Sequence, residues 1–246
     1  MEAGPPRSFP ELLAAYRRDP LALVGRIPGL WLVNKPSGPS SHDMVLRARE
    51  RLGIKRVGHA GTLDPMASGL LIILAGEAAR LFDQLQELPK TYLAGFRLGE
   101  RTDSQDGTGT PIPDWRPARP PPVAEEEFAT ALDRFQGEIL QTPPMHSALK
   151  RRGRPLYRLA RQGKTVARTP RPVRIYHRRL AAFDGCSGSL ELTVSRGFYV
   201  RTLIDDLGEV LGCGATMASL VRLGIGPFRL ENAADPERAF GAPDRS

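Results

Sequence analysis

A single acid in a loop of small residues is the first feature of this sequence that could carry out chemistry. The segment VGHAGTLDPMASG, residues 57–69, contains Asp64 and His59 among small side chains, between two apolar flanks. Such a carboxylate can act as a nucleophile or as a general base. Leu-Asp-Pro is also typical of a simple turn, because aspartate hydrogen-bonds its own backbone. The segment alone leaves both interpretations open.

Two other side chains would suit a reactive carboxylate. Tyr92 stands near the start of the apolar segment KTYLAGFRLG and offers an aromatic face to an unstacked base. Arg201 follows SRGFYV at the start of an expected helix, and a guanidinium near a carboxylate keeps it ionised at neutral pH. Taken singly, Tyr92 is better explained by core packing and Arg201 by a charge on a helix surface.

The basic residues indicate a polyanionic partner. The 246-residue chain has a formal net charge of +8, and thirty of its 35 basic residues are arginines, which suit phosphate and base contacts. Residues 139–183 contain no Asp or Glu. This one-sided charge favours nucleic acid over a solvated basic face, a patch for an acidic protein or arginine enrichment from GC-rich coding. The basic residues of the stretch are Lys150, Arg151, Arg152, Arg154, Arg158, Arg161, Lys164, Arg168, Arg171, Arg174, Arg178 and Arg179.

Several other classes of function lack their motifs. Gly163-Lys164-Thr165 is not a phosphate-binding loop, because Arg158 stands where its first glycine belongs. Two cysteines and four widely spaced histidines form no metal-binding pattern, so no metal is expected. No apolar run is long enough for a membrane helix, and the N-terminal residues lack the pattern of a secretory signal. We therefore expect a cytoplasmic protein without a membrane partner.

Hydrophobic patterning predicts an α+β fold with a mixed, largely antiparallel central sheet flanked by helices and loops. The expected helices are spaced too irregularly between the strands for a doubly wound sheet. A segment rich in Gly, Pro and Asp, residues 100–122, is expected to be a long surface loop. Strands are expected at 30–33, 70–76, 90–99, from 173 onward and at 190–194, and helices at 10–18, 41–53, 76–86, 124–137, 155–162, 200–211 and 215–226.

Five motifs in this order resemble those of the TruB family of pseudouridine synthases. They are LVNKPSGPSSHD, RVGHAGTLDPMASGLL, KTYLAGFRLGERTDSQD, SALKRRGRPLYRLARQG and SRGFYVRTLIDDLGEVLGCGA. The resemblance covers the chain from Leu30 to Arg222. It implies a pseudouridine-synthase fold and an enzyme that isomerises the uridine at position 55 in the T-loop of tRNA.

Carried over by position, the resemblance assigns four residues to the reacting base. It makes Asp64 the catalytic aspartate, Tyr92 the aromatic side chain that stacks on the flipped uracil, and Arg201 the partner of the aspartate. It also makes Leu220 an apolar contact of the base, although a leucine in such a segment is ordinarily a core residue. The order of the five motifs supports Asp64 most firmly.

The resemblance also implies roles in binding RNA and in supporting the site. His59 matches a histidine that occupies the space left by flipped nucleotides, Lys35 matches a lysine that supports the active-site loops, and Asp106 matches an acid of the active-site network. Taken singly, His59 could be an ordinary loop histidine and Lys35 a solvated strand end. The expected contacts to RNA in the basic stretch are Lys150, Arg151, Arg152, Arg154 and Arg158.

The implied reaction has no redox step, so no cofactor is expected. It breaks the N1–C1′ bond, joins C5 to C1′ and removes the C5 proton, after the base has flipped out of its stack. The sequence leaves open whether the carboxylate attacks the sugar, attacks the base or removes the ribose 2′ proton.

The expected partner is the T-arm of tRNA, bound by a monomer without an obligatory protein partner. The expected division is an N-terminal extension (1–28), a catalytic domain (29–230) with a basic RNA-binding region (146–179), and a polar, weakly ordered tail (231–246) too short for a C-terminal PUA domain. A guide-RNA-dependent rRNA pseudouridine synthase and a non-catalytic tRNA-folding chaperone are the alternatives.

Overall fold

The chain forms two compact units that share two strands. The computed structural model describes residues 9–21, 29–147, 149–151, 153–160 and 162–241. The first unit comprises residues 1–92 and 221–246, and the second comprises residues 93–220. Strands β4 (Lys90–Leu98) and β10 (Ala215–Ile225) contribute residues to both units. The expected catalytic domain, residues 29–230, contributes residues to both units, and its bounds stay a prediction.

The first unit is organised around strand β3 (Ser68–Ala75), whose residues from Gly69 to Ala75 are all buried. It pairs antiparallel with β1 (Leu30–Lys35) and β2 (Val57–His59), and parallel with β10 at Val221 and Arg222. Strand β11 (Phe228–Arg229) pairs antiparallel with β10. Because side chains alternate across a strand, β3 supplies two cores. Leu70, Ile72 and Leu74 belong to one, and Leu71, Ile73 and Ala75 belong to the other.

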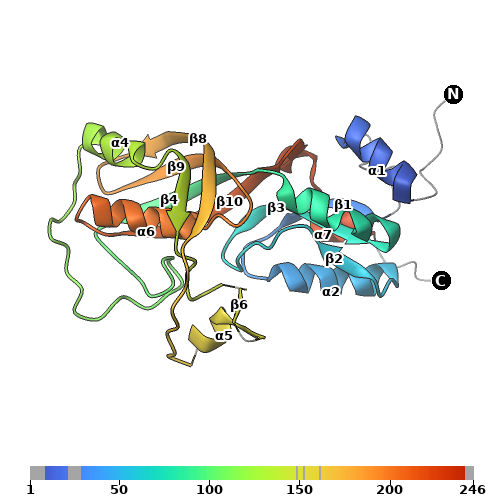
Figure 1. Cartoon of the computed structure of the whole chain (residues 1–246), viewed down its shortest axis with the longest axis horizontal. Coiled ribbons are helices and arrows are strands. Elements are labelled where there is room, and N and C mark those ends of the chain that lie inside the picture. Colours follow the sequence, from blue (N-terminus) through green and yellow to red (C-terminus); the bar gives the residue numbers. More distant parts are fainter. Residues whose placement is uncertain (1–8, 22–28, 148, 152, 161, 242–246) are drawn as a thin grey trace. The chain divides into compact units, whose positions relative to one another are not determined.

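Helices cover both cores of the first unit (Figure 1). Helix α2 (Ser41–Leu52) begins with a capping box between Ser40 and Asp43, and Gly53 follows its last residue with a φ of 64°. Helix α1, predicted at 10–18, buries Leu12 and Tyr16 against the first core. The helical elements are α1 (Phe9–Arg18), α2 (Ser41–Leu52), η2 (Gly76–Leu81), α3 (Phe82–Glu87), η3 (Leu230–Asn232) and α7 (Pro236–Ala239).

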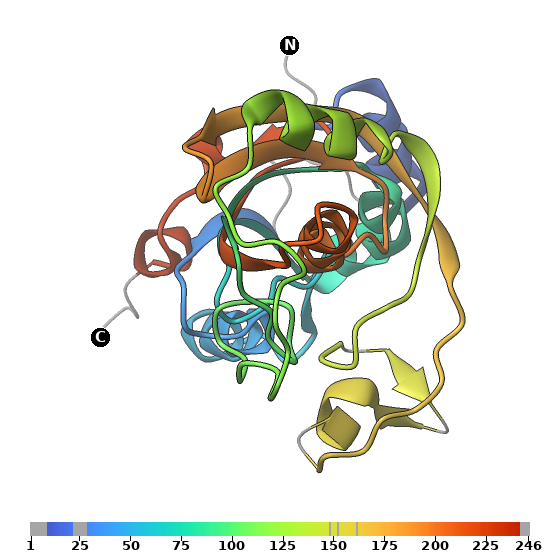
Figure 2. The ribbon, with the colours of Figure 1, turned by 90° about the vertical axis from the view of Figure 1, so that its left-hand side faces the viewer.

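The sheet continues into the second unit in the order β10-β4-β9-β8-β5. Figure 2 shows helix α6 (Val200–Val210) along the inside of the curved sheet. Phe128 of helix α4 (Glu125–Asp133) stacks on Phe96 of β4, with ring centroids 5.0 Å apart. The strands are β5 (Gly137–Gln141), β8 (Arg171–Phe183) and β9 (Ser187–Val194). Strand β3 pairs in parallel with β10, whereas β1 and β2 with β3, β11 with β10, β5 with β8, and β8 with β9 pair antiparallel. The predicted mixed, largely antiparallel α+β fold is confirmed.

A basic segment between β5 and β8 extends away from the sheet of its unit (Figures 1 and 2). It contains a two-stranded ribbon and a short helix, which lies inside the range predicted at 155–162. Its elements are β6 (Lys150–Arg151), β7 (Arg154–Pro155) and α5 (Leu156–Ala160).

Residues 215–226, predicted to be a helix, form strand β10 instead, so that prediction was wrong. Ala, Met and Leu favour helices, but this preference is weak and is overridden because β10 lies between β3 and β4 in the sheet. Val221, Gly224 and Ile225 were the local signals against a helix. Residues 100–122, expected to lie on the surface, bury Thr102, Ser104 and Asp106.

The tail beyond residue 230 packs on the first unit as far as residue 241, contrary to the expected weak order. Ala234 bridges Val33 of β1, and Phe240 is 6% exposed. The Phe240 and Trp31 rings meet edge to face, with centroids 6.2 Å apart.

Replacing Phe240 with Ala tests this packing. We expect Phe240→Ala to lower the free energy of unfolding by about 3 kcal/mol, because a buried ring leaves a cavity. Phe82→Ala is the matched control, since Phe82 is 38% exposed, and should cost less than half as much. Urea denaturation followed by circular dichroism measures both, and equal losses would contradict the packing of the tail.

Candidate active site

Asp64 lies in a loop that is fastened at several backbone positions. The loop joins β2 to β3, and the amide of Ala67 donates to the carbonyl of Asp64 at 3.1 Å. Asp64 therefore lies in a turn, which is compatible with a catalytic role. The Leu63 amide donates to the Ser41 hydroxyl at 2.8 Å, and that hydroxyl donates to the Leu63 carbonyl at 3.1 Å. Asp64 is half-buried in this loop. The turn therefore holds a carboxylate in a fixed, partly desolvated position.

Lys35 contacts the same loop through its buried side chain. Its side chain is wholly buried, and Nζ donates to the carbonyls of Pro36 and Pro39 at 2.8 Å and of Pro65 at 3.4 Å. Burial and then the nearby Arg222 charge lower the pKa of Lys35 to about 8, against the opposing effect of Asp64. The interpretation of Lys35 as a solvated strand end is therefore wrong, and its cation favours the ionised form of Asp64.

Arg222 is a second buried cation beside this loop, at a position to which no sequence motif gave a role. It is 1% exposed, and Nε donates to the Leu70 carbonyl at 2.7 Å. Nη2 and Nη1 donate to the carbonyls of Gly61 at 3.0 Å and Thr62 at 3.3 Å. An arginine inside the largely apolar segment ASLVRLGIG was the available signal, because a charged side chain is buried only where its donors find partners.

His59 ends strand β2 and enters the Asp64 loop. Burial, followed by the charges of Arg222 and His42, lowers its pKa to about 4. The imidazole is therefore neutral at pH 7. Among the described residues, no hydrogen-bond partner reaches its buried Nδ1.

Arg201 is held in the second unit by Asp106. Arg201 Nη1 lies 3.2 Å from Asp106 Oδ2, and both side chains are buried. Nη2 donates to the His146 carbonyl at 2.7 Å. Asp106 Oδ1 also accepts from the hydroxyls of Ser104 at 2.8 Å and Thr108 at 2.6 Å. Arg201 is thus a positioned cation, and the interpretation as a surface charge is wrong.

The loop that contains Asp106 is joined to helix α6 by further residues, which were not among the predicted site residues. Arg101 makes a bidentate pair with Asp205, at 2.8 and 2.7 Å, and Gln105 Nε2 donates to Asp205 at 3.0 Å. The Thr202 hydroxyl donates to Gln105 Oε1 at 2.8 Å. The opposite charges in the segments RTDSQD and RTLIDD were the sequence signal for these contacts.

Tyr92 and Leu220 stand at the points where β4 and β10 pass between the units. Tyr92 is half-buried, and Leu220 is 7% exposed. Lys35, His59, Asp64 and Tyr92 belong to the first unit. Arg201, Asp106 and Leu220 belong to the second, so the pairing of Asp64 with Arg201 stays a prediction.

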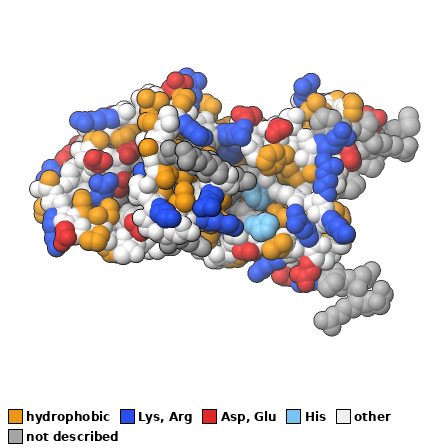
Figure 3. Space-filling view, turned by 60° about the horizontal axis from the view of Figure 1, so that its bottom comes forward, with side chains coloured by type: hydrophobic (Ala, Val, Ile, Leu, Met, Phe, Trp, Pro, Cys, Tyr) orange, Lys and Arg blue, Asp and Glu red, His pale blue; other side chains and the backbone are white. Residues whose placement is uncertain are grey.

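The basic segment presents exposed cations. Arg154 and Arg158 are exposed, Lys150 and Arg151 are described only in their backbone, and Arg152 lies outside the described residues. Lys and Arg side chains are spread over the face shown in Figure 3, with Asp and Glu side chains between them.

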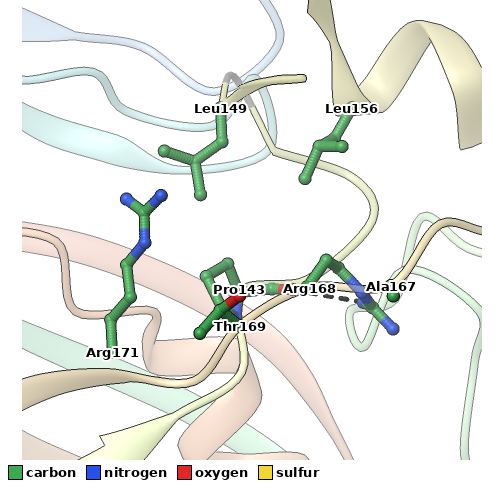
Figure 4. Close-up of a pocket in the computed structure, with 7 residues that line it drawn as sticks. All are labelled: Pro143, Leu149, Leu156, Ala167, Arg168, Thr169 and Arg171. Atoms are coloured by element: carbon green, nitrogen blue, oxygen red, sulfur yellow. Dashed lines mark hydrogen bonds between the residues drawn. The ribbon is translucent and has the colours of Figure 1, made fainter. Parts of the chain in front are cut away.

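A pocket of about 250 Å³ lies at the base of this segment (Figure 4). Leu149 and Leu156 form an apolar wall, and Arg168 donates to the Pro143 carbonyl at 3.1 Å. The pocket is lined by Pro143, Leu149, Leu156, Ala167, Arg168, Thr169 and Arg171.

Within the described ranges, no group of three or more His, Cys, Asp or Glu side chains is placed to hold a metal ion. In the same ranges, no helix is long and apolar enough to cross a membrane.

Comparison with known proteins identifies the class of the fold. Two crystal structures, an archaeal box H/ACA sRNP Nop10-Cbf5 complex and a Cbf5-Nop10-Gar1 complex, match with a TM-score of 0.62 each, at 26% and 29% identity. The matches cover 86% and 83% of this chain, and 52% and 53% of those chains. The chain thus spans about half the length of the chains that it matches in these two structures. Its fold is that of the pseudouridine synthases, as predicted.

Sequence comparison defines the family. Residues 49–200 match the TruB family pseudouridylate synthase N-terminal domain, and residues 201–237 match the tRNA pseudouridylate synthase B C-terminal domain. "tRNA pseudouridine synthase B" of Burkholderia lata is 47% identical over 89% of this chain and 67% of its own length. The protein of the same name from Tolumonas auensis is 41% identical over 89% of this chain and 69% of its own length. The chain belongs to the TruB family of pseudouridylate synthases.

The low pKa of His59 makes stability depend on pH. The His59 side chain takes up a proton near pH 6.5 in the unfolded chain, but only near pH 4 in the folded protein. The stability that depends on neutral His59 is therefore fully present above pH 6.5. As the pH falls to 4, the free energy of unfolding decreases by about 1–3 kcal/mol for this reason. We expect His59→Gln to flatten the stability profile between pH 4 and 6.5 in urea denaturation. The control His177→Gln, at an exposed position, should keep the wild-type slope, and an unchanged slope in His59→Gln would contradict the assignment.

Proposed function

We propose that the chain is a tRNA pseudouridine synthase that isomerises uridine 55 in the T-loop, with Asp64 as the catalytic residue. The observation that carries the proposal is the GTLDP loop of a TruB-family chain, in which Asp64 lies half-buried beside the cation of Lys35. Relatives that are 41–47% identical over most of the chain bear the name tRNA pseudouridine synthase B.

The proposed reaction needs only groups that the chain supplies. The uridine flips out of the T-loop, where unstacking costs less than in a duplex. Asp64 acts on the ribose or the base, the N1–C1′ bond breaks, and C5 replaces N1 at C1′. Loss of the C5 proton completes the isomerisation. Substrate and product have the same oxidation state, so no redox cofactor takes part.

The proposal gives the other side chains supporting roles. Tyr92 stacks on the uracil, and Arg201, oriented by Asp106, pairs with Asp64. Leu220 contacts the base, and neutral His59 fills space near the flipped nucleotide. A guanidinium and a buried ammonium both favour the ionised carboxylate, which is the form needed by a nucleophile or a base.

We propose that the basic segment supplies the affinity for tRNA. Residues 139–183 have no acid, and Arg154, Arg158 and Lys164 are exposed. Phosphate contacts of this kind position an RNA without reading its sequence. The proposed enzyme works as a monomer in the cytoplasm without a protein partner.

A guide-RNA-dependent pseudouridine synthase is the second candidate, favoured by the likeness to Cbf5 in its complexes. Relatives of considerably higher identity bear the tRNA name, which favours the first candidate. The two candidates differ in whether the protein alone acts on tRNA.

Tritium release from C5 of uridine tests the proposal and the role of Asp64. Purified protein is incubated with a tritiated T-arm stem-loop or with full-length tRNA, without cofactor, guide RNA or other protein. We expect one tritium released per RNA. Asp64→Asn should lower the rate by at least about 10³-fold while the tRNA Kd changes less than about threefold, because phosphates supply most of the affinity.

Asp83→Asn, at an exposed position of α3, is the matched control and should keep wild-type turnover. Measurable turnover by Asp64→Asn would contradict the assignment of Asp64. Tight binding without release from either RNA would support the guided enzyme or a folding chaperone.

Neutralising the basic segment tests the RNA footprint. We expect Arg154→Gln, Arg158→Gln and Lys164→Gln together to weaken tRNA binding and to lower the slope of log Kd against log salt by about 2–3, because each lost phosphate contact removes about 0.7–0.9. The control combines Arg17→Gln, Arg18→Gln and Arg238→Gln, which removes the same charge at exposed positions of α1 and α7. Equal slopes in the two triple variants would contradict the footprint.

A further inference from the structure

We propose that Arg222 is a positioning residue that fixes the backbone of the Asp64 loop and so places the carboxylate for reaction. The inference rests on the proposed function of Asp64. It concerns residues of the first unit alone.

The Arg222 guanidinium has three backbone carbonyls as acceptors. Gly61 and Thr62 lie on the segment that leads into Asp64, and Leu70 lies on the strand that follows it. The planar fork therefore joins both ends of the loop. A lysine at this position would present all its donors from one nitrogen, without the rigid planar geometry of the guanidinium.

The strand pairing fixes Arg222 relative to β3. Arg222 pairs with Gly69 in the parallel register of β10 and β3. Gly69 has a φ of 104°, and a Cβ there would lie 2.4 Å from the Arg222 carbonyl oxygen. Only glycine permits this approach of the two strands. The backbone of Arg222 is therefore fixed against β3, and the guanidinium donates to the loop from this fixed position.

Arg222 and Lys35 hold different parts of the loop. Lys35 binds the carbonyl of Pro65, directly after Asp64, whereas Arg222 binds the carbonyls of Gly61 and Thr62, before it. Asp64 is thus bracketed by carbonyls fixed to buried cations. Displacements of about 1 Å at a reacting group can cost about 100-fold in rate, so this bracketing has a catalytic consequence.

The experiment compares Arg222→Lys with Arg49→Lys. Arg49 is the matched control, because it donates to the carbonyl of Val57 at 3.1 Å in the same unit, outside the Asp64 loop. Single-turnover tritium release and the tRNA Kd are measured well below the unfolding temperature of each variant. We expect Arg222→Lys to slow the chemical step by about 100-fold with a Kd within about threefold of wild type, and Arg49→Lys to change neither.

Hydrogen exchange of the loop amides gives a second readout, which needs no activity. We expect the amides of Leu63 and Ala67, which are bonded in the folded loop, to exchange at least tenfold faster in Arg222→Lys, while those of β3 keep their protection. If Arg222→Lys fails to fold, Gly61→Ala replaces it. A Cβ at Gly61 would contact Arg222 Nη1 at 3.6 Å, and its φ of 100° disfavours a side chain, so the same losses are expected.

The possible failures are distinct. A folded Arg222→Lys variant with the wild-type chemical rate and unchanged loop exchange would overturn the positioning role. A wild-type protein that releases no tritium would overturn the proposed function. In that case, faster hydrogen exchange of the loop amides in Arg222→Lys would still show that Arg222 fixes the loop backbone.

Discussion

The burial of two cations is the constraint on which the candidate site depends. A guanidinium and an ammonium can leave water only if their donors find acceptors. Arg222 and Lys35 donate to backbone carbonyls at the two ends of the Asp64 loop and in the Pro-rich turn after β1. The conformation of the loop follows from this requirement. If the loop moved, buried donors would be left without acceptors.

In the second unit, a buried cation is paired with a carboxylate instead of with backbone carbonyls alone. Arg201 is buried against Asp106, and the remaining acceptor capacity of Asp106 is used by hydroxyls of its own loop. Removing one partner of such a buried pair leaves an uncompensated charge. The long segment after β4 is therefore ordered by the charges on α6, although its composition is that of a loop.

The sequence supported most of the fold because hydrophobic period and capping residues are local signals. The continuous apolar run of β3 led directly to a correct strand, and the helix expected at 41–53 is α2, which Ser40 caps. Strand β10 was mistaken for a helix because its residues favour helices locally, and its neighbours in the sheet are distant in sequence. Phe240 was missed for a similar reason, since an isolated aromatic residue in a polar tail has no periodicity. Arg222 and Asp205 were missed because their roles depend on contacts made only after folding.

Chemistry and affinity draw on different physical properties of this chain. The loop of Asp64 requires rigidity, which comes from buried donors and from glycines that allow close backbone approach. The basic segment requires exposed charge, and it extends from its unit on a thin ribbon and a short helix. Salt screens exposed charges strongly and buried ones weakly. Ionic strength should therefore act on RNA binding while leaving the geometry around Asp64 unchanged, so the two contributions can be measured separately in one protein.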